Sequence, residues 1–348
     1  MNCIRNYTTY IINKDRYLYV MDSEAELKKS FIYLADQHNQ KITTCKKVLL
    51  GHDSGNFRNT AYTIDTFFES THFPKAMRMF DIGKKAMLAA ASDLIAVGSI
   101  PTGALISLAL PQSTPKKTAI NIFKGIVHSC RHLNIGIIGG DTKKANEISI
   151  AICCFGKILT QMKTRWTANK GDIIYITGEV GKAALGLKAM LNQNLEISLR
   201  NNKKFAKQCE QAFLTPPVKK EYASLIANFA TSSCDISDGF FYSLRLLTQK
   251  YGIKIEKLPI PAELEMFTIR QIIDLLNIGE DYCCLFTVSK KNEETMLAEA
   301  KKNKLAVIRI GKVLEKKSSI NLMWKNKEIK INDIAGYDAF NAPFSKGL

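Results

Sequence analysis

Apolar residues in the first half of the chain follow two spacings, and the change between them predicts helices and strands. Apolar residues three and four positions apart indicate helices, whereas short alternating or continuous apolar runs indicate strands. We expect a first helix to begin at Asp22-Ser23, with an apolar stripe at Leu27, Phe31 and Leu34. Further helices are expected at residues 80–97 and 115–133, and strands at residues 48–50, 60–64, 103–110, 135–138 and 148–155. The last strand is almost continuously apolar, which favours a central place in a sheet.

A polar segment at residues 163–172 separates this half from a second series of elements. The segment contains the turn signal Asn169-Lys170-Gly171, and we place a domain boundary near it. Further on, the polar residues 192–204 are expected to form a surface loop. Helices are expected at residues 181–191, 218–229, 240–251, 263–276 and 292–303, and strands at residues 173–177, 232–234, 253–256, 283–288, 306–313, 320–323 and 328–331.

Helices and strands that alternate in both halves predict an α/β (α+β) fold in two domains. We assign residues 1–22 to an N-terminal extension of unknown role, residues 23–162 to the first domain and residues 163–348 to the second. The chain of 348 residues is 46% apolar and 23% charged, which is typical of a globular protein and excludes a disordered or fibrous one.

Charge and cysteine content bear on partners and compartment. The formal net charge is +17, which attracts anions such as phosphorylated metabolites. The lysines are scattered and not interleaved with aromatic residues, so nucleic acid is not the favoured partner. Nine cysteines without a C-x-x-C spacing favour free thiols in a reducing compartment, and we expect a cytoplasmic protein. The longest apolar stretch, residues 86–110, is interrupted by Asp93, Gly98 and Pro101, so no membrane span is expected.

The usual nucleotide-binding and metal-binding signatures are absent. Residues 178–183 (GEVGKA) follow a predicted strand and open a predicted helix, but they lack the Walker spacing and the hydroxyl residue after the lysine. We interpret them as an ordinary strand-to-helix turn. His128 and His132 lie four residues apart on a predicted helix and are interpreted as part of a solvated helix face.

Aspartates that follow apolar strands or interrupt an apolar helix are the most informative feature. Their positions are Asp53, Asp65, Asp93, Asp141, Asp235 and Asp238. A buried carboxylate needs a partner, because removing its charge from water is costly. Carboxylates gathered at strand ends are hard oxygen ligands that suit Mg²⁺, and Mg²⁺ neutralises the phosphates of a nucleotide. The residues therefore predict a Mg²⁺-dependent phosphate enzyme without a P-loop.

A series of short motifs across residues 25–340 resembles the thiamine-monophosphate kinase family. The motifs are Gly51-His52-Asp53, Thr63-Ile64-Asp65-Thr66, Asp81-Ile82-Gly83-Lys84-Lys85, Ser92-Asp93-Leu94, Gly139-Gly140-Asp141-Thr142, Asp235-Ile236-Ser237-Asp238-Gly239, Gly279-Glu280-Asp281-Tyr282 and Gly336-Tyr337-Asp338. This family is related to aminoimidazole ribonucleotide synthetase and selenophosphate synthetase. The resemblance implies direct transfer of the ATP γ-phosphate to thiamine monophosphate, and a homodimer formed through the sheet of the N-terminal domain.

The resemblance also implies roles for individual residues. Mg²⁺ ligands are implied at Asp53, Thr63, Asp65, Asp93, Asp141, Asp235 and Asp238, of which Asp53 and Asp238 are also placed in catalysis. ATP contacts are implied at Gly140, Asp141, Arg165 and Ser237, and contacts to thiamine monophosphate at His72, Glu280 and Tyr337. The chain departs from the family pattern at His52, where a second aspartate is usual, and at Ile64, where a hydroxyl residue is usual.

Two alternatives stay open at this point. One is another ATP-using enzyme of the superfamily with a different acceptor. Selenophosphate synthetase is not favoured, because neither Cys3 nor Cys45 has the expected setting of a reactive cysteine. The other is a non-catalytic nucleotide-binding or nucleic-acid-binding relative, to which the charge of +17 could contribute.

Overall fold

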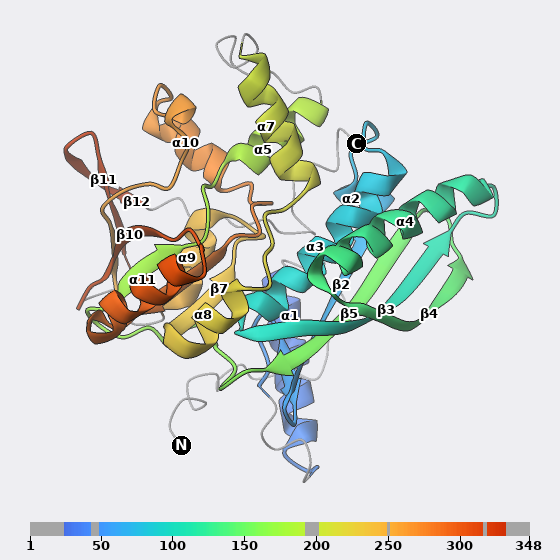
Figure 1. Ribbon diagram of the computed structural model, residues 1–348, viewed down its shortest axis with the longest axis horizontal. Coiled ribbons are helices and arrows are strands. Elements are labelled where there is room, and N and C mark those ends of the chain that lie inside the picture. Colours follow the sequence, from blue (N-terminus) through green and yellow to red (C-terminus); the bar gives the residue numbers. More distant parts are fainter. Residues whose placement is uncertain (1–23, 43–48, 192–201, 249–250, 316–318, 332–348) are drawn as a thin grey trace, which may run out of the picture.

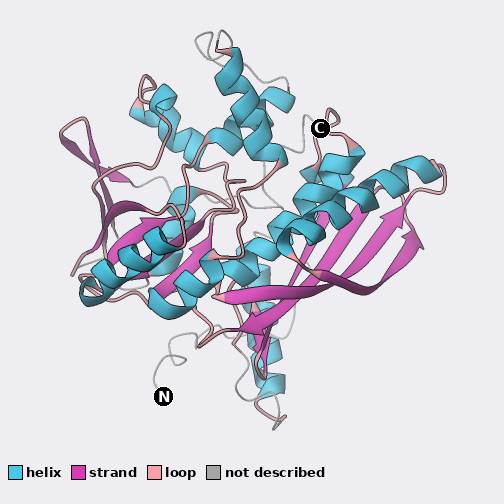
Figure 2. Cartoon of the chain, in the orientation of Figure 1, coloured by secondary structure: helices cyan, strands magenta, loops and turns pink. Residues whose placement is uncertain are grey.

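The computed structural model describes residues 24–42, 49–191, 202–248, 251–315 and 319–331 (Figures 1 and 2). The strands of the first half are β1 (Gly55–Phe57), β2 (Thr60–Phe68), β3 (Ser99–Leu110), β4 (Gly136–Lys144) and β5 (Ser149–Ile158). They form one sheet in the order β1-β2-β5-β3-β4. Only β3 and β4 run parallel, and the other neighbours are antiparallel. The prediction of a central strand at residues 148–155 is confirmed by the position of β5.

Helices cover one face of this sheet. This layer is formed by α3 (Met79–Ala96) and α4 (Lys116–Leu133), and the first half also contains α1 (Glu24–Asn39) and the short α2 (Glu69–His72). Helices α3 and α4 lie side by side along the sheet (Figure 1). They approach so closely that a Cβ atom on Gly83 would lie 1.9 Å from the carbonyl oxygen of Ile122. The expected helices at residues 80–97 and 115–133 are therefore confirmed, and glycine is what allows their close crossing.

The two faces of the sheet differ in burial. Along β2, the buried residues Ala61, Thr63 and Phe67 alternate with the exposed residues Tyr62, Ile64 and Phe68. We call the first side, which packs under α3, the inner face, and the second side the outer face. Successive side chains of a strand point to opposite sides, so neighbours in sequence are separated by the sheet.

The second half builds a seven-stranded sheet in the order β12-β11-β8-β10-β6-β9-β7. Its strands are β6 (Ile173–Ile176), β7 (Ala230–Asp235), β8 (Ile253–Ile255), β9 (Cys284–Val288), β10 (Ile308–Val313), β11 (Ile320–Trp324) and β12 (Lys327–Ile331). Its helices are α5 (Lys182–Met190), α7 (Lys203–Leu214), α8 (Tyr222–Phe229), α9 (Phe240–Leu247), α10 (Ile269–Leu276) and α11 (Glu293–Lys302), with short 3₁₀ turns η3 (Ala262–Leu264) and η4 (Lys290–Asn292). The predicted α/β (α+β) class is confirmed, whereas the division at residues 162–163 stays a prediction.

Three expectations for the second half were wrong in part. Lys203 and Lys204, expected in a surface loop, begin α7, whose first turn is capped by the Asn202 side chain accepting from the Phe205 N–H at 3.1 Å. The helix expected from residue 218 starts at Tyr222. The helix expected at residues 263–276 is divided, because Thr268 caps α10 in a reciprocal capping box. The strand expected at residues 48–50 was also wrong, because Leu49 and Leu50 lie in no strand and β1 begins at Gly55. Residue 48 and residues 192–201 lie outside the described residues.

Helix α3 joins the two halves, since it packs against both the first sheet and the elements α7, α8, β7 and β9 of the second half (Figure 1). The first expected helix is confirmed as α1, but Phe31 and Leu34 of its apolar stripe are 59% and 60% exposed. None of the helices in the described part of the chain is both long and apolar enough to cross a membrane.

Candidate active site

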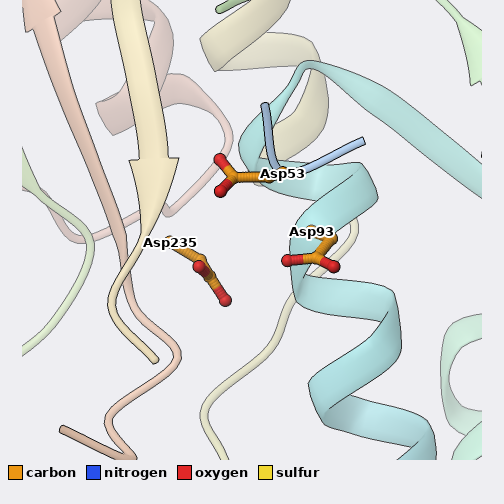
Figure 3. Close-up of side chains that lie close together, drawn as sticks. All are labelled: Asp53, Asp93 and Asp235. Atoms are coloured by element: carbon orange, nitrogen blue, oxygen red, sulfur yellow. The ribbon is translucent and has the colours of Figure 1, made fainter. Parts of the chain in front are cut away.

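Three of the predicted aspartates meet where α3 lies against the second half (Figure 3). Asp53 comes from the loop before β1, Asp93 from α3 and Asp235 from the end of β7. Each offers one carboxylate oxygen, and these oxygens lie within 4.8 Å of one another. We call these residues the acidic cluster. Asp235 thus meets two aspartates that precede it by more than 140 positions along the chain.

The carboxylate of Asp53 is closed to solvent. Its Oδ1 atom forms an ion pair with Nη2 of Arg165. Its Oδ2 atom is buried and has no hydrogen-bond partner among the described residues. A buried carboxylate oxygen without a donor is costly, so this atom calls for a positively charged ligand.

Asp93 and Asp235 are each oriented by a hydroxyl group. The Thr63 hydroxyl donates to Oδ2 of Asp93 at 2.6 Å, from the inner face of β2. The Ser92 hydroxyl donates to Oδ2 of Asp235 at 2.7 Å, which links α3 of the first half to β7 of the second. One helix therefore supplies a carboxylate to the site and also positions the carboxylate that arrives from the other half.

Asp65 adds a fourth charge from the inner side of β2. Its pKa is raised to about 6, mainly by burial, while Lys28 opposes the rise and the nearby Asp53 carboxylate adds to it. Burial also raises the pKa of Asp235 to about 8, with Asp53 as the next contributor. The pKa of Asp93 is raised well above its usual value by burial and then by Asp65. Carboxylates this close and this buried repel one another when ionised.

The donor set fits a divalent metal ion. Clustered carboxylate oxygens are the ligands that Mg²⁺ prefers, and a cation would remove the mutual repulsion of the acidic cluster. The unpartnered Oδ2 of Asp53 is placed to meet such an ion. Asp53, Asp93 and Asp235 would hold it, with Asp65 close enough to interact electrostatically with both Asp53 and Asp93.

Asp238 and Ser237 lie in the loop between β7 and α9, beside the acidic cluster. Asp238 interacts electrostatically with Asp235, although it is not one of the three converging carboxylates. The Ser237 carbonyl accepts a hydrogen bond of 2.8 Å from the Glu280 N–H. Gly279 permits this contact, because a Cβ atom there would lie 2.0 Å from the Ser237 carbonyl oxygen. The loops that carry Ser237 and Glu280 are thus tied together.

Glu280 and Arg165 both have partners within the chain. Glu280 forms an ion pair with Lys85 of α3, with 2.7 Å between Oε2 and Nζ. Arg165 forms its ion pair with Asp53, and its expected contact with ATP stays a prediction. Its backbone N–H donates to Nδ1 of His52 at 3.3 Å, and the His52 ring lies 5.5 Å from that of Trp166. Burial and then Arg165 lower the pKa of His52 to about 4, so His52 is neutral and acts as an acceptor.

His72 lies at the end of α2, past the end of β2. Its Nδ1 atom accepts from the Phe68 N–H at 3.1 Å, and its ring meets the edge of Phe67 at 5.7 Å. These contacts fix the turn between β2 and α2. The strand geometry puts Phe68 roughly 10 Å beyond Asp65, so His72 is in the neighbourhood of the site but not in the acidic cluster.

Gly140 and Asp141 are not brought to the acidic cluster within one chain. Paired residues run across the sheet from Thr66 through Ala151 and Ser107 to Asp141, which is three strand spacings, or roughly 14 Å. These residues share the outer face, and Asp141 is exposed and pairs with Lys143 at 3.1 Å. Gly140 has a structural reason to be glycine, since a Cβ atom there would lie 2.0 Å from the Ile106 carbonyl oxygen.

Two residues of the site were not assigned a role from the sequence, namely Ser92 and Lys85. Ser92 stands beside Asp93, and only the fold reveals that it faces Asp235. Lys85 carries a weak signal, because it is a charged residue directly before the apolar run Ala86–Ala91 of the helix. Tyr337, Cys3 and Cys45 lie outside the described residues.

Comparison with known proteins gives a consistent picture. The family model described as AIR synthase related protein, N-terminal domain, matches residues 50–158. The chain is similar to the thiamine-monophosphate kinase of Buchnera aphidicola subsp. Acyrthosiphon pisum, at 31% identity over 279 residues that cover 77% of this chain and 84% of that one. It is also 31% identical to the thiamine-monophosphate kinase of Aquifex aeolicus over 237 residues, which cover 66% of this chain and 76% of the relative.

Solved structures include a similar fold with ligands. The structure of AaThiL complexed with AMPPCP and TMP matches with a TM-score of 0.72 and 26% identity. The match covers 93% of this chain and all of that one.

Proposed function

The chain belongs to the thiamine-monophosphate kinase family and is a thiamine-phosphate kinase, and we propose that it transfers the γ-phosphate of ATP directly to thiamine monophosphate with the help of Mg²⁺. A terminal oxygen of the acceptor phosphate forms a bond to the γ-phosphorus, and the bond from that phosphorus to the β-phosphate oxygen breaks. The products are thiamine diphosphate and ADP. The observation that carries the proposal is the convergence of Asp53, Asp93 and Asp235 in a chain of this family.

The acidic cluster is proposed to hold the metal. Asp53, Asp93 and Asp235 supply converging oxygens, and Asp65 and Asp238 complete the negative surroundings. Mg²⁺, when bound, supplies charge neutralisation for the phosphates of ATP. The Thr63 and Ser92 hydroxyls hold Asp93 and Asp235 in place, so little reorganisation is needed when the ligand arrives.

The residues around the cluster are proposed to position the two substrates. Arg165 and Ser237 would contact ATP. For this, the Arg165 guanidinium would exchange part of its contact with Asp53 for a hydrogen bond to a phosphate oxygen. His72, Glu280 and Tyr337 would contact thiamine monophosphate. No covalent nucleophile on the protein is required, because the acceptor oxygen is already anionic. Holding the two phosphates in line accelerates the transfer.

A homodimer through the outer face is part of the proposal. Tyr62, Ile64 and Phe68 of β2 and Leu105 of β3 expose apolar surface on that face, and Ile64 is 69% exposed. An exposed apolar sheet face of this kind marks a contact surface. Asp141 lies on the same face, so a second copy packed there would bring Asp141 and Gly140 toward its partner, and we propose that they contact ATP in this dimer.

A cytoplasmic location is also proposed. It is supported by the seven cysteines in the described part of the chain, which are all free thiols, including the adjacent pairs Cys153-Cys154 and Cys283-Cys284. Free, largely buried thiols are typical of a reducing compartment.

Product formation tests the proposal. The protein is incubated with Mg²⁺, ATP and thiamine monophosphate, and thiamine diphosphate and ADP are separated by chromatography. We expect equal amounts of the two products, and none with Asp238→Ala. ADP formed only with another phosphorylated acceptor would assign the chain to a different substrate, and nucleotide binding without turnover would contradict the proposed reaction.

A further inference from the structure

Lys85 is a charged side chain on a buried part of α3. Its side chain is 4% exposed, and its neighbours on the helix are the buried residues Gly83, Ala86, Met87 and Ala89. A lysine is rarely this buried unless it is paired, because its charge must leave water. Burial lowers the pKa of Lys85, and the carboxylates of Glu280 and Asp281 oppose that change.

The ammonium group of Lys85 is held by two parts of the second half. Its Nζ atom lies 2.7 Å from Oε2 of Glu280 and 3.1 Å from the centre of the Phe213 ring of α7. An ammonium over an aromatic face and beside a carboxylate is stabilised from both directions. Asp281 does not compete for the same role, because its Oδ1 atom accepts the Gly181 N–H at 3.0 Å.

Glu280 is thereby fixed at both ends. Its backbone is in the left-handed region, with φ 71°, and its N–H donates to the Ser237 carbonyl. Its side chain ends on Lys85. The Glu280 side chain is still 23% exposed, whereas that of Lys85 is closed to solvent. A ligand can therefore contact the Glu280 side chain directly, whereas Lys85 can affect the ligand only by holding Glu280 in position.

Lys85 and the metal-positioning residue Ser92 are on the same helix. Seven residues separate them, which corresponds to about 10 Å along the axis of α3. Ser92 orients the carboxylate of Asp235, and Lys85 orients that of Glu280. Helix α3 therefore orients two carboxylates that belong to the second half of the chain. A carboxylate away from the acidic cluster repels the acceptor's phosphate and attracts a cation. The thiazolium ring of thiamine monophosphate is such a cation.

We propose that Lys85 is a positioning residue that holds Glu280 to receive the cationic organic part of the acceptor, an inference that rests on the proposed function. Lys85 neutralises the inner side of the carboxylate and fixes its direction. The outer side of the carboxylate stays available to the acceptor's positive charge. Lys85 itself does not touch either substrate.

Steady-state kinetics of Lys85→Met test this role, with Lys84→Met as the matched control. Lys84 is the neighbouring lysine of α3 and pairs with Asp81 at 3.0 Å, away from Glu280. We expect Lys85→Met to raise the KM for thiamine monophosphate at least tenfold, while kcat and the KM for ATP change less than threefold. Lys85→Arg should restore most of the affinity, and Lys84→Met should behave as the wild type.

Removing one partner of a buried ion pair can also unfold a protein. The double variant Lys85→Met/Glu280→Gln removes both charges and provides a folded comparison. We expect its KM for thiamine monophosphate to equal that of Glu280→Gln alone, because Lys85 acts through Glu280. A double variant whose KM is much higher than that of Glu280→Gln would overturn the inference.

Other outcomes separate the inference from the function on which it rests. A folded Lys85→Met protein with the wild-type KM for thiamine monophosphate overturns the role of Lys85 and leaves the kinase activity standing. A lower kcat together with equal increases in the KM for ATP and the KM for thiamine monophosphate would show that Lys85 has only a structural role. A wild-type protein that forms no thiamine diphosphate overturns the proposed function itself.

Discussion

The inner and outer faces of the first sheet carry opposite kinds of surface, although they are made from alternate residues of the same strands. The inner face holds Thr63 against Asp93 under α3. The outer face exposes Ile64 and Tyr62, and at its far edge Asp141. Asp65 and Asp141 belong to similar-looking motifs, yet burial raises the pKa of Asp65, whereas Lys143 and the Thr142 N–H lower that of Asp141.

The difference shows that a short motif does not define a site. The period of two along a strand sends adjacent residues to opposite sides of the sheet, and α3, which also packs against the second half of the chain, lies on the inner side. The inner face has the enclosed carboxylates that a metal requires. The outer face has apolar surface that a second protein chain could cover.

The largest expected effect is on catalysis at the inner side. Asp235→Asn removes one charge from the acidic cluster while keeping its shape, and we expect kcat/KM for ATP to fall by about a thousandfold, since a lost contact to transition-state charge costs about 3–4 kcal/mol. Asp274→Asn is the control, because Asp274 is exposed and pairs with Arg270 on its own helix. Equal activity in the two variants would show that the acidic cluster is not the catalytic site.

Packing above the inner face gives the next largest effect. Gly83→Ala places a Cβ atom against the Ile122 carbonyl and must push α3 from α4, so we expect a loss of about 3 kcal/mol or more in the free energy of unfolding. Gly55→Ala in β1 is the control, since its Cβ atom would meet nothing nearer than 3.6 Å. Urea denaturation followed by circular dichroism measures both, and equal midpoints would contradict the close crossing.

Much of the fold could be predicted from such local patterns, and the exceptions have physical causes. Helices α3 and α4 were predicted almost to the residue, because long apolar periodicity identifies a helix without tertiary information. Helix α7 was missed because Lys203 and Lys204 make its first turn look like a loop, whereas Phe205, Cys209 and Phe213 form its buried stripe. The stripe of α1 was predicted but is exposed, because the pattern shows that a helix has an apolar face and not what covers it.

A smaller effect is expected in the metal-free protein, where the pH dependence of the free energy of unfolding distinguishes Asp65 from Asp141. The pKa of Asp65 is about 6 in the folded state and close to 3.9 when unfolded, so the folded state binds more protons between these values. The free energy of unfolding should therefore fall as pH rises from 4 to 6. Asp65→Asn should remove on the order of 2 kcal/mol of that fall.

Asp141→Asn is the matched variant on the outer face. The pKa of Asp141 is lowered by its hydrogen bonds to Lys143 and the Thr142 N–H, so Asp141 titrates below the pH range in which Asp65 does. Chemical denaturation from pH 4.5 to 7.5, with a chelator present, compares the three proteins. Parallel curves for Asp65→Asn and the wild type would contradict a buried Asp65.

The smallest effect on the free energy of unfolding is expected at the outer face, where a substitution should instead change the mass of the assembly in solution. Ile64→Lys replaces a side chain that is 69% exposed, so the free energy of unfolding of one chain should change by less than about 0.5 kcal/mol. If two copies pack through this face, the lysine charges should separate them, and sedimentation should report half the wild-type mass. An unchanged dimer would place the contact elsewhere, and a wild-type monomer would contradict the proposed assembly.

The convergence of carboxylates could be predicted from the sequence, but the contacts that orient them could not. The aspartates were found from the sequence because carboxylates beside apolar strands are unusual, and Asp53, Asp93 and Asp235 do converge. The partners of those groups were not predictable, because Arg165 on Asp53 and Lys85 on Glu280 each join residues more than 100 positions apart. Asp141 could not be excluded from the cluster by its motif, since only strand order places it at the far edge of the sheet.

Anomalous diffraction from crystals grown with Mn²⁺ and AMPPCP tests the central claim most directly. Mn²⁺ takes the place of Mg²⁺ and gives a signal at its own position. We predict a peak enclosed by the carboxylates of Asp53, Asp93 and Asp235, with the analogue's phosphates beside it. Bound AMPPCP with no metal at these three residues, and with the Arg165–Asp53 ion pair unchanged, would contradict the assignment of the acidic cluster as the metal site.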